Sequence, residues 1–154
     1  MILGKPIAEF VFTALIAGIL GAVAMELVMW LISRGQWAKG NMIVALGSMV
    51  TRSRENAFRV GVWIHCISAF AFALIYAFAM MALGLAHFPT AFFVGTGFGV
   101  LHGIIVSLML VWIVAEKHPL EEFQETGLAV GVSHLAGHVA YGAIVGLVVG
   151  LSPL

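Results

Sequence analysis

Long apolar runs separated by short polar links dominate the chain. An α-helix that crosses a bilayer takes about 20 mostly apolar residues. Four runs meet this requirement, at residues 7–33, 59–85, 89–115 and 126–150. The links at 34–58 and 116–125 carry most of the charges, and a short turn, AHFP, joins the second run to the third. The pattern predicts an all-α polytopic integral membrane protein, an antiparallel four-transmembrane-helix bundle that forms a single membrane domain over residues 1–154.

Composition supports a membrane protein and excludes several other classes. Hydrophobic residues make up 62% of the 154 residues and charged residues 9%, with a mean hydropathy of +1.12, whereas a soluble domain has about 25% charged residues. The net charge of zero removes any argument for a nucleic-acid partner. The single cysteine, Cys66, excludes an intrachain disulfide. The apolar run after Lys5 is too long for a signal peptide, so we expect the first span to be retained.

The positive charges predict an orientation. Six of the seven Lys and Arg residues lie in or beside the two links: Arg34, Lys39, Arg52, Arg54, Arg59 and Lys117. The positive-inside rule then puts both links in the cytoplasm and both termini on the other side. The tryptophans agree, because an interfacial belt on the cytoplasmic face would hold Trp30, Trp37, Trp63 and Trp112. We expect a multi-pass protein of the cell membrane, most simply a bacterial inner membrane.

Small residues recur at every fourth position, which allows membrane helices to pack closely. The third span has Gly95, Gly99 and Gly103. The fourth has Gly142, Gly146 and Gly150, extended by Gly127 and Gly131. These faces predict tight helix packing within the lipid bilayer. They also suit assembly into a homo-oligomer or a larger membrane complex.

Five ionisable residues fall inside the spans. At about 1.5 Å of rise per residue, Glu26, His65 and His134 lie about 9–12 Å from the cytoplasmic end of their helices. On the same scale, His102 and His138 lie about 18–20 Å deep, near mid-membrane. Ionisable groups inside a bilayer are costly and by default mark functional sites.

The favoured interpretation is a metal site. His134 and His138 are one helical turn apart and can reach one ion, and imidazole with carboxylate suits iron, copper or zinc. The predicted ligands of one ion or a close pair are Glu26, His65, His102, His134 and His138, with Met109 and Met29 as weaker candidates. Such a centre would serve redox chemistry, as in a membrane metal-dependent oxidoreductase, or metal handling. The sequence assigns no catalytic residue.

Two alternatives stay open. His102 and His138 have matching heights, as the axial ligands of haem b require, and Gly99 and Gly103 would leave room for the macrocycle. Alternatively, the protein is an accessory subunit or proton path, in which the histidines form interhelical hydrogen bonds.

Outside the predicted site, the polar residues have simpler interpretations. The link 116–125 reads as a solvated acidic turn that includes His118, and His87 as a surface residue. We expect Cys66 to be a packed small residue.

Overall fold

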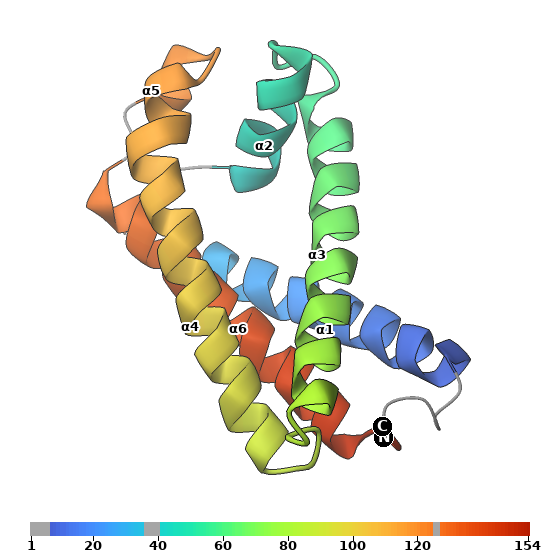
Figure 1. Ribbon diagram of the computed structural model, residues 1–154. Helices are drawn as coiled ribbons and strands as arrows, with labels where there is room; N and C mark the ends of the chain where they lie inside the picture. The colour runs from blue at the N-terminus through green and yellow to red at the C-terminus, as the bar shows by residue number, and fades with distance from the viewer. Residues whose placement is uncertain (1–6, 36–40, 125–126) are drawn as a thin grey trace.

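The computed structural model describes residues 7–35, 41–124 and 127–154, and every regular element in them is helical (Figure 1). Four helices are long and apolar enough to cross a membrane: α1 (Ile7–Arg34), α3 (Ala57–Ala82), α4 (Thr90–Met109) with the residues up to Trp112, and α6 (Leu128–Leu151). The shorter elements are α2 (Met42–Thr51), α5 (Ala115–Lys117), the π-helical segment η2 (Leu110–Val114) and the 3-10 turn η3 (Glu121–Phe123). The chain therefore has the helices of a multi-pass membrane protein, and the predicted spans are reproduced to within a few residues.

Two local features add to the four predicted spans. The link after α1 contains α2, which begins at Asn41, because the side chain of Asn41 accepts the backbone N–H of Val44 at 3.1 Å and caps the helix. The third span continues past Met109 through the π-helical turn η2 into α5. A π-turn widens a helix locally and often accompanies a functional site.

The predicted glycine ridges form the contact between α4 and α6. A Cβ atom added to Gly95 would lie 2.7 Å from Gly146 Cα, and one on Gly142 would lie 2.8 Å from Gly99 Cα. Gly103 meets Leu135 and the His138 side chain further along. Residue numbers rise along α4 as they fall along α6, so these two helices are antiparallel. Gly127 has no neighbour within 4 Å of its Cβ position and does not extend the ridge.

The other helices pack in two further contacts. In α1, the position of a Gly18 Cβ is 3.1 Å from the Ala69 carbonyl oxygen of α3, and that of Gly21 is 2.8 Å from the Tyr141 ring of α6. Figure 1 shows α1 crossing α3 at a steep angle, so the long helices are not all aligned. Beside α3, α2 approaches so closely that a Cβ on Gly47 would lie 2.7 Å from Gly61 N.

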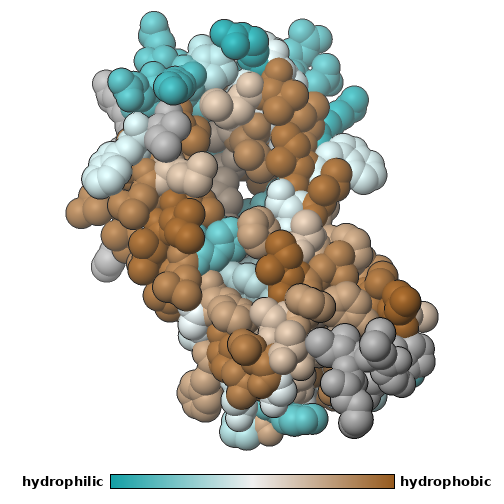
Figure 2. All heavy atoms as spheres, in the orientation of Figure 1, coloured by the Kyte–Doolittle hydropathy of each residue, from teal (hydrophilic) through white to brown (hydrophobic). Residues whose placement is uncertain are grey.

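The outer surface suits a bilayer. Large apolar side chains are exposed along all four long helices, and brown hydrophobic atoms cover most of the face in Figure 2. Trp30, Trp63 and Trp112 are exposed, as expected of residues that contact lipid. Trp37, Lys39 and Lys5 lie outside the described residues. The apolar helices therefore suggest contact with a lipid bilayer.

Candidate functional site

A cavity of about 440 Å³ occupies the wedge between α3 and α4, which meet at the turn 83–89 and diverge away from it (Figure 1). Helices α1, α2 and α6 and the segment η2 complete its wall. The lining is mainly apolar, and Figure 2 shows hydrophilic side chains in the hollow between the hydrophobic flanks. All four histidines of the predicted site line this cavity: His65, His102, His134 and His138. A few polar groups in an apolar cavity of this size are typical of a binding site.

The two histidines of α6 share one hydrogen-bonding pattern. His134 Nδ1 lies 2.8 Å from the Val130 carbonyl oxygen, and His138 Nδ1 lies 2.7 Å from the His134 carbonyl oxygen. A carbonyl can only accept, so each Nδ1 carries the proton and donates it. Each Nε2 of the neutral ring is then left with its lone pair. The two residues are only 3% and 7% exposed, and His134 Nε2 is buried without a hydrogen-bond partner.

His102 lies beside this pair. Its ring contacts the His138 ring edge to face, with centroids 4.6 Å apart, and packs on Phe72 at 4.0 Å. Its Nδ1 is 3.1 Å from the Tyr76 hydroxyl, which makes a hydrogen bond between α4 and α3. Interhelical bonding therefore accounts for His102. The hydrogen bonds described for His134 and His138, in contrast, stay within α6.

Glu26 and His65 meet where α1 and α3 cross. Glu26 Oε1 is 3.4 Å from His65 Nε2, close enough for an ion pair if the histidine is protonated. Neither atom has a hydrogen bond within the described part of the chain, although both are buried. His65 lines the cavity, and Glu26, its neighbour on α1, is not part of the lining.

Four methionines line the same cavity: Met25, Met29, Met42 and Met49. Met29 was a weaker predicted ligand and is among them. Met109 is not, and it is 48% exposed. Seven residues fall only about 20° short of two full helical turns. Met109 and His102 therefore share nearly one helix face, and the difference between them comes from the neighbours that each meets. The sequence did not point to Met25, Met42 and Met49. A methionine in an apolar helix looks the same in the sequence whether it fills the core or lines a cavity.

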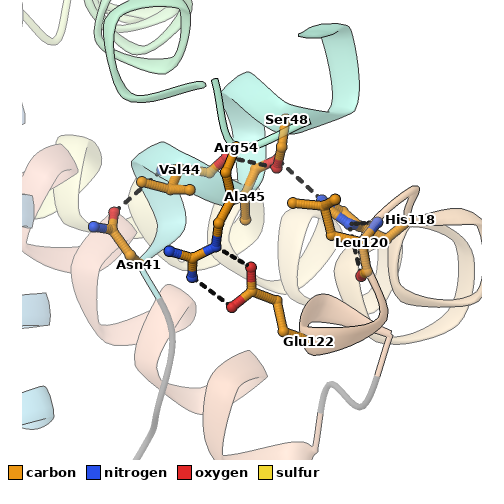
Figure 3. Close-up of polar contacts among 8 residues, drawn as sticks. All are labelled: Asn41, Val44, Ala45, Ser48, Arg54, His118, Leu120 and Glu122. Carbon is orange, nitrogen blue, oxygen red and sulfur yellow. Dashed lines mark hydrogen bonds and ion pairs between the residues drawn. The ribbon is translucent and has the colours of Figure 1, made fainter. Parts of the chain in front are cut away.

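Residues of the two polar links line one end of the cavity, and Figure 3 shows the polar contacts between these links. His118 is 2% exposed: its Nδ1 accepts the Leu120 N–H at 3.1 Å, and its Nε2 donates to the Ala45 carbonyl of α2 at 3.1 Å. The link is thus not a fully solvated turn, because His118 ties it to α2. Cys66 and His87 are both exposed, so Cys66 is not packed as expected.

An exposed ion pair joins the same two links. The Arg54 guanidinium donates two hydrogen bonds to the Glu122 carboxylate, at 2.5 and 2.6 Å (Figure 3). These hydrogen bonds lower the pKa of Glu122 and raise that of Arg54. The pair therefore connects the segment after α2 with η3 at the cavity's polar end.

Two tests bear on a cofactor. Among the described residues, no three His, Cys, Asp or Glu side chains are close enough together to hold one metal ion in this conformation. His134 and His138 nevertheless present two free nitrogens to one cavity. The haem geometry does not fit, because the rings of His102 and His138 are in contact rather than facing each other across an iron. Gly99, which we expected to leave room for the macrocycle, instead packs against α6. A Cβ atom added to Gly99 would lie 3.1 Å from Val139 Cα.

Comparison of the chain with models of protein families, with curated proteins and with solved structures gives no match.

Proposed function

We propose that this chain is an integral membrane metal-binding protein, in which His134 and His138 of α6 bind a transition-metal ion inside the cavity. Iron, copper and zinc all accept imidazole nitrogen. A metal centre inside the bilayer would serve metal handling or electron transfer.

The observation that carries the proposal is the hydrogen bond from Nδ1 of each histidine to a backbone carbonyl oxygen. A histidine that binds a metal through Nε2 donates its Nδ1–H to a carbonyl or carboxylate, which fixes the tautomer and raises the basicity of the ligand nitrogen. Both histidines make that bond to the carbonyl four residues earlier. The side chains are thus held in the ligand form before any ion binds.

Buried side-chain atoms without a hydrogen bond support the same proposal. Three buried side-chain atoms of the described chain have no hydrogen bond: Glu26 Oε1, His65 Nε2 and His134 Nε2. A buried polar group without a partner costs about 1–3 kcal/mol, so native structures rarely leave one without a reason. All three belong to the residues that the sequence predicted as ligands. The Glu26 carboxylate would offset part of the charge of a bound cation.

We also propose that the two polar links are cytoplasmic and both termini are on the opposite side, following the positive-inside rule. The polar end of the cavity, next to His118 and Glu122, would then face the cytoplasm.

Metal content tests the function directly. Detergent-purified protein is stripped with chelator, reloaded separately with iron, copper or zinc, and analysed for bound metal. We expect about one ion per chain, and a loss of affinity of about tenfold or more in His134→Ala and in His138→Ala.

His87→Ala is the matched control, because His87 is exposed in the turn before α4 and away from the cavity. It should bind as the unmodified protein does. Full metal binding by both α6 variants, or no binding of any of the three metals by the unmodified protein, would refute the proposal.

A further inference from the structure

The thioether side chains beside the histidine pair bear on which metal is bound. Gly137 lies between His134 and His138 in the chain and is buried. A Cβ atom at Gly137 would lie 3.1 Å from Met25 Cγ and 3.4 and 3.5 Å from Met29 Cγ and Sδ. The missing side chain at Gly137 therefore leaves space that two methionines of α1 fill, and the Met29 sulfur lies against α6 at Gly137, the residue that precedes His138 in the chain.

Building on the proposed function, we infer that the ion is copper(I), bound by Nε2 of His134 and His138 and by Sδ of Met29. Soft thioether sulfur selects copper(I), a soft monovalent ion, over the divalent metal ions of biology, and imidazole binds it as well. Met25 packs beside Met29 on the same helix face, and α2 contributes Met42 and Met49, so thioethers line the cavity from two helices.

The ligand count favours the same ion. Structural zinc is almost always bound by four protein ligands, whereas copper(I) is stable with two or three. The described residues hold no group of three His, Cys, Asp or Glu that could bind one ion. Two imidazoles and one thioether form a set that satisfies copper(I), whereas zinc sites with three protein ligands are built from Cys, His and carboxylate and use no thioether. Met29 is then a specificity-determining residue.

Competition for copper(I) tests the inference. The purified protein, kept reduced and without oxygen, is titrated with copper(I) against the chromophoric chelator bathocuproine disulfonate, and X-ray absorption reports the ligand atoms. We expect copper–sulfur scattering in the unmodified protein. Met29→Leu should lose that signal and bind copper(I) at least about tenfold more weakly.

Two further variants sharpen the result. Met109→Leu removes an exposed methionine outside the cavity and should change neither readout. Gly137→Ala keeps every ligand, and its methyl group would press on Met25 Cγ at 3.1 Å while meeting Met29 at the ordinary contact distances of 3.4 and 3.5 Å, so copper(I) binding and the sulfur signal should be retained.

The outcomes separate the two proposals. Metal binding with no sulfur signal, with unchanged affinity in Met29→Leu, or with zinc retained as tightly as copper(I) would overturn the copper inference and leave the proposed function intact. No binding of copper, zinc or iron at all would instead remove the proposed function and this inference with it.

Discussion

The buried histidines differ in which ring nitrogen the protein uses. In His134 and His138 a carbonyl of the same helix takes the Nδ1–H and leaves Nε2 free. His118 uses both nitrogens, one toward Leu120 and one toward Ala45, so its ring is fully engaged in joining two segments. A buried histidine with both nitrogens bonded is structural, whereas one with a free Nε2 can bind a ligand.

At the scale of single residues, the Arg54–Glu122 pair predicts a pH dependence. Because the guanidinium stabilises the carboxylate, the pKa of Glu122 lies below its ordinary value of 4.5. A lowered carboxyl pKa means that the contact between the links is complete above the ordinary value and is lost as the pH falls through the lowered one. We expect a titration of the Glu carboxyl carbons by NMR to show Glu122 ionising below the exposed glutamates.

The charge-neutral variant Arg54→Gln should return the pKa of Glu122 toward 4.5. Arg52→Gln removes a positive charge from the same link and should leave that pKa lowered. If Glu122 gives the same titration curve in both variants, Arg54 is not its specific partner.

At the scale of helices, the glycines decide how closely α4 and α6 approach. Gly95, Gly99 and Gly103 lie on the face toward α6 and are buried. Gly97, on the same helix, has nothing within 4 Å of its Cβ position. The ridges are thus occupied within the chain, where they bring the His102 and His138 rings into contact. The expected assembly of several copies through these faces stays a prediction.

Gly95→Ala should therefore be destabilising, and Gly97→Ala should not. The added methyl at Gly95 would overlap the backbone of Gly142 and Gly146, which cannot move without separating the helices. Overpacking of this kind costs about 1–3 kcal/mol. Reversible unfolding in mixed detergent micelles measures the difference, and equal stability of the two variants would contradict the packing described above.

At the scale of the whole molecule, the cavity results from helices that do not run side by side. The tight α4–α6 pair and the α2–α3 pair diverge from a shared turn, and α1 crosses both α3 and α6. At the polar end of the cavity, hydrogen bonds from His118 to Ala45 and from Arg54 to Glu122 join the α2–α3 pair to the segment that follows α4. The walls of the site are therefore held together by contacts between segments far apart in sequence.

The proposed orientation of the molecule predicts which segments a membrane-impermeant maleimide can reach in intact cells. In a Cys66→Ser background, His87→Cys lies in the turn before α4 and should be labelled from outside. Glu55→Cys lies in the link before α3 and should be labelled only after the cells are permeabilised. The reverse pattern would show that the positive-inside rule fails for this chain.

The sequence by itself determined the number and extent of the long apolar helices, the helix face on which each residue lies and the heights of the ionisable residues along the helices. Hydropathy is a local sum, and a helix has a fixed rise and period, so these quantities follow from residue order alone. They were enough to predict that His65, His102, His134 and His138 would gather at one site.

Only the tertiary structure decided which atoms at that site are free. The crossing angle of α1, the packing of α2 and the divergence of α3 from α4 depend on close contacts between segments distant in sequence. These contacts put Met29 beside Gly137 of α6 and into the cavity that the histidine pair lines, left Met109 on the outside and buried His118. Helical periodicity fixes the direction of a side chain from its own axis, but the neighbour that it meets is set by how the axes cross.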